Sequence, residues 1–328
     1  MKVRNNRVNS FNYQDNTTQS LDLPRGQVYR EIALHLTGAP TVTAANNIAA
    51  NLGRAEVWSL LTQISIVVNG SDVIRTFTGD ELMVLNYLWY RVQPMRETTY
   101  GDGVTANPSF DRILRIPFWS LGLVHPQATL LDARRVDSLQ LKVQFGNYAS
   151  INSAATAWTT SPTLEIYQEY VAPDDPKAPF GPFHTWRSSP MTNQYTNTQK
   201  DAQIQLPIGD VYRSFFMNTN VSGTDTTGIL NEFRFRSGSL IYFDCTENVL
   251  RQKNYVQSGL VDHASAVLSK STKFNLDAWY YANLMDSGAM HDGIDSLGFA
   301  QLALDIDVTG QANANFVVHP QLIIPAGR

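Results

Sequence analysis

The sequence predicts an all-β protein built from two tandem eight-stranded jelly-roll sandwiches, a double jelly roll, each with a short helix between strands. Three observations lead to this prediction. The chain has 328 residues, more than most single domains hold, so two units of about 150 residues are the first expectation. Two motifs of the first half recur in the same order in the second half. Apolar and polar residues alternate along most of the chain, which is typical of strands that bury one face.

The first repeated motif is an octapeptide. "LPRGQVYR" occupies Leu23 to Arg30 and "LPIGDVYR" occupies Leu206 to Arg213, with six of the eight positions identical. Proline lacks a backbone N–H and suits the point where a strand leaves the hydrogen-bonded ladder, and glycine permits a tight reversal before the next strand. We therefore interpret each copy as a corner between two strands. A binding loop used twice is the alternative.

The second repeated motif is longer. Asn69 to Tyr87 aligns without a gap with Ser237 to Tyr255, and Gly, Ser, Thr, Leu, Asn and Tyr coincide at six positions. The spacer between the two motifs is 38 residues in the first half and 23 in the second. We therefore expect a 15-residue insertion in the first half, within residues 39–59.

Strands are expected wherever the alternation is regular. The pattern begins at Ile32, Leu34 and Leu36. Further strands of the first half are expected within residues 114–122, 138–145 and 163–171. Those of the second half are expected within residues 274–284, 300–308 and 316–325. Every second side chain of such a strand faces the same side of its sheet, so each half can bury its own core.

Helical spacing is rare, and its clearest case begins at Thr78. Thr78 can cap a helix, and Glu81 three residues later completes a capping box. One face of this helix would carry Leu82, Leu85 and Trp89. A weaker helix is expected from Thr246, at the matching place in the second motif. Each unit is thus predicted to hold one helix between strands.

The prediction divides the chain into four segments. They are an N-terminal arm over residues 1–13, a first jelly roll over 14–172, a proline-rich connector over 173–190 and a second jelly roll over 191–328. The connector overlaps "VAPDDPKAPFGPF" (residues 171–183), whose four prolines and one glycine stop strand pairing and stiffen the chain. The arm carries Lys2, Arg4 and Arg7, is followed by Asp15 and has no apolar run. It is either a solvated, poorly ordered arm or one that contacts anionic lipid or a neighbouring subunit.

Composition excludes several classes of protein. The formal net charge of −4 gives no basic surface for neutralising phosphates, so no specific nucleic-acid partner is expected. The single cysteine, Cys245, excludes an intrachain disulfide framework. No stretch approaches the roughly 20 apolar residues of a membrane span, and the first residues lack the apolar centre of a secretory signal.

No catalytic, cofactor-binding or metal-binding residues are predicted, and an enzyme is not expected. The histidines have no zinc-ligand spacing: His35, His125, His184, His263, His291 and His319. "HDGID" at His291 to Asp295 could hold calcium, but a polar turn is the preferred interpretation. "GDG" at 101–103 does not open a helix after a strand, as a nucleotide site would require. Cys245 aligns with Phe77 and is interpreted as a packed core thiol.

The motifs in their order resemble those of a known family. "LPRGQVYREIALHLTG" followed by "ISIVVNGSDVIRTFTGDELMVLNY", repeated as "LPIGDVYRSFFMNTN" and "FRFRSGSLIYFDCTENVLRQKNY", resembles the double jelly-roll major capsid proteins of tailless icosahedral, membrane-containing bacteriophages. The compact, short-loop members are the most similar. The resemblance in architecture covers the chain from about residue 16 onward, and the motifs amount to some fifty residues.

The resemblance implies a structural function. In that family three chains form a homotrimer, whose six barrels make a pseudo-hexagonal tile of an icosahedral shell around an internal membrane and genome. The implied partners are neighbouring trimers, penton and minor capsid proteins, and the membrane vesicle, which Lys2, Arg4 and Arg7 would touch. The implied location is the capsid shell of the virion, assembled in the host cytoplasm. No cofactor is implied.

Two other classes stay open. Tandem jelly rolls also build some secreted amidases and copper oxygenases, although the missing signal and the lone cysteine argue against them. A virion spike or a carbohydrate-binding protein is the second alternative. Bound copper or glycan cleavage would indicate an enzyme, and flat hexagonal arrays would indicate a capsid tile.

Overall fold

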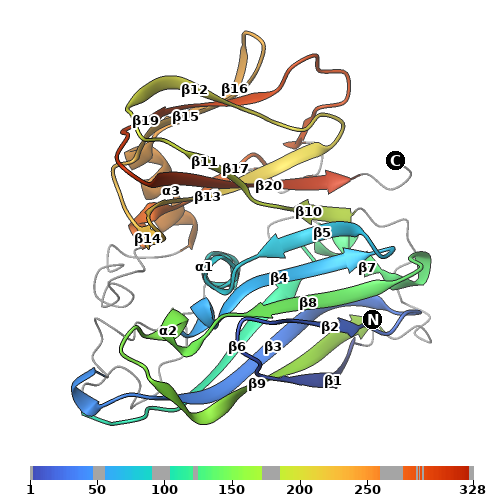
Figure 1. Cartoon of the computed structure of the whole chain (residues 1–328). Helices are drawn as coiled ribbons and strands as arrows, with labels where there is room; N and C mark the ends of the chain where they lie inside the picture. The colour runs from blue at the N-terminus through green and yellow to red at the C-terminus, as the bar shows by residue number, and fades with distance from the viewer. Residues whose placement is uncertain are drawn as a thin grey trace. The chain divides into compact units, whose positions relative to one another are not determined.

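The computed structural model describes residues 3–46, 56–90, 104–120, 125–171, 185–258, 276–285, 287, 289 and 292–324. These residues form two compact units, and the change from the first to the second falls between Thr185 and Trp186. Residues 172–184, which include most of the predicted connector, lie outside the described residues. Each unit is a sandwich of antiparallel sheets (Figure 1).

The first unit contains two sheets. One has the strand order β1-β9-β3-β6, with the short β7 added to β3, and the other has the order β2-β8-β4-β5. The strand bounds are β1 Val3–Asn12, β2 Thr18–Asp22, β3 Val28–Thr41, β4 Leu61–Val68, β5 Asp72–Phe77, β6 Phe110–Pro117, β7 Leu131–Asp132, β8 Leu139–Phe145 and β9 Ala157–Val171.

The second unit repeats this arrangement. One sheet has the order β11-β20-β13-β17, with the short β14 and β18 also paired to β13, and the other has the order β12-β19-β15-β16. The strand bounds are β11 Met191–Gln194, β12 Gln199–Gln205, β13 Val211–Val221, β14 Thr224–Asp225, β15 Leu230–Ser237, β16 Leu240–Thr246, β17 Trp279–Asn283, β18 Ile294–Asp295, β19 Ala303–Val308 and β20 Ala314–Ile324.

The two units share one connectivity. When the eight principal strands of each unit are numbered along the chain, both units have the order 1-8-3-6 in one sheet and 2-7-4-5 in the other. This is the connectivity of a jelly roll. The predicted double jelly roll is confirmed, and the repeated motifs mark equivalent places in two copies of one fold.

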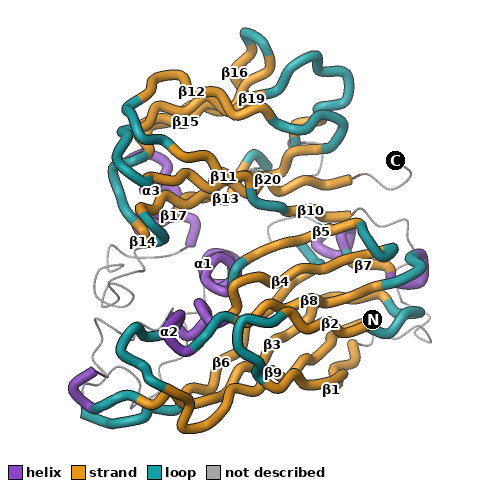
Figure 2. Tube along the Cα trace, in the orientation of Figure 1, coloured by secondary structure: helices purple, strands orange, loops and turns teal. Residues whose placement is uncertain are grey.

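Each unit has one longer helix between its fifth and sixth principal strands, as predicted (Figure 2). The helices are α1 Gly79–Tyr90 and α3 Glu247–Ser258. The predicted capping box is present: the Thr78 backbone N–H donates to Glu81 Oε2 at 2.7 Å, and the Glu81 N–H donates to Thr78 Oγ1 at 3.2 Å. The side chains of Leu82 and Leu85 are buried, and that of Trp89 lies outside the described set. The remaining elements are β10 Thr185–Ser188, α2 Tyr148–Ile151 and 3-10 helices at Ala44–Asn46, Glu56–Leu60, Pro126–Thr129, Ala133–Arg135 and Leu276–Ala278.

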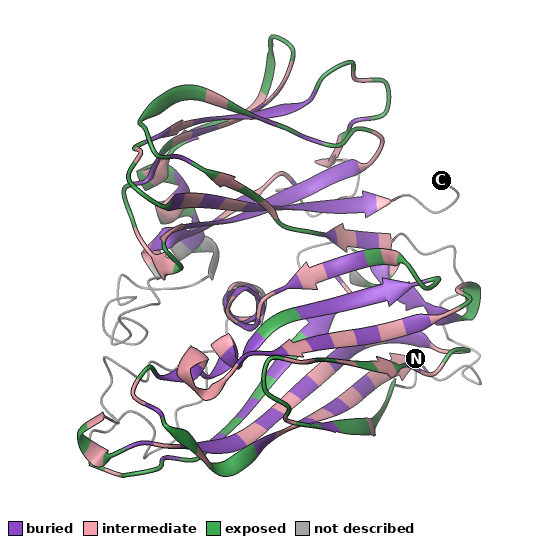
Figure 3. Cartoon of the chain, in the orientation of Figure 1, coloured by how far each residue is buried: buried purple, intermediate pink, exposed green. Residues whose placement is uncertain are grey.

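Alternating burial follows the alternating sequence, as the striped strands of the first unit show (Figure 3). In β8 every second residue is buried: Leu139, Leu141, Val143 and Phe145. In the second unit one apolar cluster takes residues from both sheets, including Phe215 and Met217 of β13 and Leu304 and Ile306 of β19. The core of that jelly roll therefore lies between its two sheets.

The prediction of a separate N-terminal arm is wrong for residues 3–12. These residues form β1, which pairs antiparallel with β9 from Val3 opposite Val171 to Asn12 opposite Thr163. Only Phe11 among the β1 side chains is buried. Backbone hydrogen bonds, not an apolar face, attach this edge strand to its sheet, so hydrophobic alternation could not reveal it.

The two units differ in the connection between their third and fourth principal strands. This connection spans residues 42–60 in the first unit and 222–229 in the second. The extra length of the first unit lies where the repeat spacing predicted an insertion. Residues 47–55 of this connection are outside the described residues.

Candidate functional site

The repeated octapeptide forms the same strand-to-strand corner in both units. The Tyr29 hydroxyl donates a hydrogen bond to the Pro24 carbonyl oxygen at 2.7 Å, and the Tyr212 hydroxyl donates to the Pro207 carbonyl oxygen at 2.5 Å. Both tyrosines are fully buried. The glycine of each copy has a positive φ, +88° and +118°, which favours glycine over other residues. The interpretation of the octapeptide as a corner is confirmed by this geometry.

The second repeated motif attaches each helix to a strand. In the first unit Asn86 Nδ2 donates to the Arg115 carbonyl oxygen at 2.7 Å, and the Arg115 N–H donates to Asn86 Oδ1 at 2.8 Å. Asn254, at the matching position of α3, makes the same pair of bonds to Tyr281 at 2.6 and 2.9 Å when its amide is oriented to satisfy both atoms. One asparagine per unit therefore bonds a helix to the backbone of the sixth principal strand, β6 or β17.

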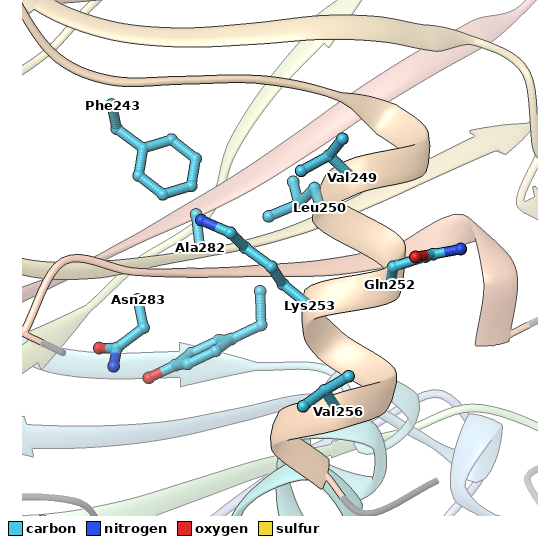
Figure 4. A pocket seen from close by; sticks show the side chains of 9 residues that line it. Phe243, Val249, Leu250, Gln252, Lys253, Val256, Ala282 and Asn283 are labelled. Carbon is cyan, nitrogen blue, oxygen red and sulfur yellow. The ribbon is translucent and has the colours of Figure 1, made fainter. Parts of the chain in front are cut away.

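An apolar groove of about 490 Å³ runs beside α3 in the second unit (Figure 4). The helix supplies Val249, Leu250, Gln252, Lys253 and Val256 to its lining, and strands β16 and β17 supply Phe243, Tyr281, Ala282 and Asn283. Lys253 Nζ lies 5.1 Å from the centroid of the Phe243 ring, a cation–π contact. The lining is mainly apolar and aromatic, with a single charged side chain.

The two helices differ in burial. On α1 the side chains of Leu82, Val84 and Leu85 are fully buried. On α3 Val249 is 48% exposed and Val256 is 81% exposed. These valines are seven residues apart, which places them on the same side of a helix. Scattered apolar residues are common on protein surfaces, but two of them lining one groove mark a candidate contact surface.

Sequence reasoning did not single out this groove. The signal available was the pair of valines, seven residues apart on a helix that is otherwise mostly polar, "ENVLRQKNYVQS". The contrast with the matching apolar helix "GDELMVLNYLWY" makes the pair visible. Only the fold shows that β16 and β17 complete the groove.

Catalytic chemistry finds no support in the residues that the structure describes. No three His, Cys, Asp or Glu side chains in that part of the chain gather to hold a metal ion. Cys245 is buried, and burial raises the pKa of its thiol to about 11, so the thiol is protonated at neutral pH. His291 of "HDGID" and residues 101–103 lie outside the described residues. Asp292 accepts a hydrogen bond from the Ser287 N–H at 3.1 Å, as a residue of a polar turn does.

Two of the three basic residues predicted to face a membrane lie in a strand and not in a free arm. Lys2 is outside the described residues, and Arg4 and Arg7 belong to β1. The Arg7 guanidinium forms an ion pair with Glu165 of β9. No helix in the described ranges is long and apolar enough to span a bilayer.

No protein-family model matches the chain, and no curated protein sequence matches it. Solved structures match over almost its whole length. The major capsid protein of Sulfolobus Turreted Icosahedral Virus is similar at a TM-score of 0.71 and 12% identity, covering 99% of this chain and 98% of that one.

Two further structures have the same fold. The major capsid protein P2 from bacteriophage PM2 matches at a TM-score of 0.63 and 12% identity, covering 99% of both chains. The capsid of the PBCV-1 virus matches at a TM-score of 0.57 and 12% identity, covering 99% of this chain and 95% of that chain. These likenesses establish the double jelly-roll fold. The similar proteins come from archaeal and algal viruses as well as a bacteriophage, so the fold does not single out bacteriophages.

Proposed function

We propose that this chain is a viral major capsid protein, which assembles as homotrimers that tile an icosahedral shell around an internal membrane and genome. Neighbouring trimers, penton proteins and minor capsid proteins are its proposed partners, and the shell of the virion is its proposed location. The proposal assigns the chain no catalytic role.

The observation that supports this function is the full-length likeness to viral major capsid proteins, combined with the repeated strand order inside one chain. Three copies of a chain with two similar units offer six similar walls. A plate with six walls can pack in a hexagonal field although its symmetry is three-fold. A function in tiling therefore gives the internal duplication a geometric purpose.

Within this proposal, the groove beside α3 is assigned to contact with a second copy of the chain. Its counterpart, α1, is already buried, whereas α3 leaves Val249 and Val256 exposed. Covering these side chains with a neighbouring subunit would remove apolar surface from water, which favours association.

Electron microscopy and light scattering of the purified protein test the proposed assembly. A capsid tile should have three times the chain mass of 36.6 kDa, a six-lobed outline and a tendency to form flat hexagonal arrays. A solitary trimer without arrays would favour a spike. A monomer at all concentrations, or bound copper with catalytic turnover, would contradict the proposal.

We also propose that Lys2, Arg4 and Arg7 lie near anionic headgroups of the internal membrane, each contributing about 1 kcal/mol. Deleting residues 1–10 would remove most of β1, so charge substitution is the cleaner test. The Lys2→Gln/Arg4→Gln double variant should bind vesicles of anionic phospholipid more weakly than the wild type. Lys200→Gln, at an exposed position of β12, is the matched control. Equal binding by all three proteins would refute the membrane contact and leave the tiling function untouched.

A further inference from the structure

A cluster of titratable side chains crosses the outer face of one sheet of the first unit. His35 of β3 lies between two carboxylates: its Nε2 is 2.6 Å from Asp111 Oδ1 on β6, and its Nδ1 is 3.2 Å from Glu165 Oε2 on β9. Glu165 also accepts hydrogen bonds from the Tyr167 hydroxyl at 2.8 Å and from Arg7 of β1. All four principal strands of the sheet β1-β9-β3-β6 therefore contribute a member.

The geometry defines the protonation state that satisfies the cluster. Ionised carboxylates only accept hydrogen bonds, and a neutral imidazole has a single N–H to donate. His35 faces a carboxylate oxygen at both ring nitrogens, so only the imidazolium can donate to Asp111 and Glu165 together. Loss of one proton removes one of the two bonds and the positive charge between the carboxylates.

The electrostatics agree with this geometry. Partial burial lowers the pKa of His35, but the hydrogen bonds to Asp111 and Glu165 raise it by more. The pKa of His35 therefore lies above the ordinary value for histidine. Hydrogen bonds from Tyr167, His35 and Arg7 lower the pKa of Glu165 to about 2. The carboxylate therefore stays ionised across the range in which His35 titrates.

The other charged groups on this face pair among themselves. Arg115 forms an ion pair with Glu31, and Arg30 forms one with Glu169 at 2.9 Å. Ile113, which lies opposite His35 in the β3–β6 register, is exposed and uncharged. Within the described residues, the groups that respond directly to the His35 proton are thus Asp111, Glu165, Tyr167 and Arg7.

The second unit has no such cluster at the corresponding place. In the alignment of the octapeptides, His35 corresponds to Asn218 of β13. The Asn218 amide donates to Asp225 Oδ1 at 2.9 Å, and it does not titrate. At this position of the third principal strand, the first unit therefore has a titratable side chain and the second unit does not.

We propose that His35 acts as a proton-dependent clasp that joins β3 to β6 and β9 on the outer face of the first jelly roll. The clasp is complete when His35 is charged, and it loosens when the proton leaves. It concerns one unit of a single chain, so it holds whether or not the chain assembles into a shell.

The sign of the pH effect follows from the linkage between protonation and folding. Because the pKa of His35 is raised in the folded state, the stabilisation is fully present below the unfolded value of about 6.5 and is lost as the pH rises through the folded value. The first unit should therefore be more stable against unfolding in mild acid than in mild alkali.

The first test is an NMR titration of the full-length protein with carbon-13 at the histidine Cε1 positions, in which His35→Gln assigns the signal. His35 should titrate above about 6.5 in the wild type and closer to that value in the Asp111→Asn/Glu165→Gln double variant. A His35 pKa at or below about 6.5 in the wild type would overturn the proposal.

The second test needs no double variant. The unfolding free energies of the wild type and of His35→Gln, measured with denaturant, should differ more at about pH 5.5 than at about pH 8.5. His125→Gln is the control for the loss of an exposed histidine. If the wild type exceeds His35→Gln in unfolding free energy by the same amount at both pH values, the role of His35 is purely structural and the proposed clasp is wrong.

Discussion

The Tyr29 hydroxyl reaches back five residues along the chain to the Pro24 carbonyl oxygen, and the matching Tyr212 does the same to Pro207. In each unit this bond closes the corner between the second and third principal strands. Three of the six residues that the two octapeptides share build this corner: a proline that ends one strand, a glycine at which the chain reverses and a tyrosine whose hydroxyl bonds across the reversal.

Removal of either hydroxyl should destabilise the protein. Tyr29→Phe and Tyr212→Phe each leave a proline carbonyl without its internal donor, which should cost about 1 to 2 kcal/mol of unfolding free energy. Denaturant unfolding followed by tryptophan fluorescence measures the loss. Tyr242→Phe is a suitable control, because the half-buried Tyr242 makes no hydroxyl hydrogen bond within the described residues. Equal stability of all four proteins would contradict the structural role of the corner bonds.

Replacing the asparagine that bonds each helix to its strand by aspartate, which has the same shape, should destabilise the protein. Asn254→Asp replaces an amide donor by an oxygen that faces the Tyr281 carbonyl, so one bond is lost and two oxygens repel each other. The expected cost is about 2 kcal/mol or more, with the same result for Asn86→Asp opposite Arg115. The exposed Gln252→Glu on the same helix is the matched control. An unchanged denaturation midpoint in Asn254→Asp would disprove the paired bonds.

An acidic side chain in the groove beside α3 should weaken self-association. Val256→Asp puts a charge where the proposed contact buries an apolar side chain, so light scattering should report a lower mass at the same protein concentration. The isolated fold should change by no more than about 0.5 kcal/mol, because the residue is at the surface. Leu297→Asp provides the control, since Leu297 is also exposed and does not line the groove. An assembly that survives Val256→Asp and Val249→Asp would place the contact elsewhere.

The thiol of Cys245 should be nearly inert in the folded protein. With a pKa of about 11 against about 8.5 in an unfolded chain, its thiolate fraction at mild alkaline pH is lower on the order of a hundredfold. Alkylation by iodoacetamide, followed by mass spectrometry, should be slower in the folded protein by at least this factor. Reaction at the rate of the urea-unfolded control would show an accessible, ionised thiol and reopen a nucleophilic role.

Much of the fold could be predicted from the sequence because its two signals act at short range. The capping box at Thr78 and Glu81 depends on residues three apart, and the alternation in β8 depends on neighbours two apart. The repeated octapeptide then indicated two units of one kind. These features together led to the double jelly roll without any long-range pairing being known.

The features that escaped prediction depend on contacts distant in sequence. Strand β1 has almost no buried side chains, and it is defined by backbone pairing with β9, about 160 residues away. The Asn86 bonds involve a strand 29 residues further along the chain. The His35 cluster joins residues as far apart as Arg7 and Glu165. No local pattern in the sequence contains these partners.

The repeated strand order also bears on how such a protein can evolve. When a gene encodes a single jelly roll, each mutation alters the same surface position in every copy of that jelly roll. This chain has two copies of the fold in one gene, so His35 could arise in one while Asn218 stands in the other, and α3 could become polar while α1 kept its leucines. Each copy is free to acquire its own chemistry under separate selection.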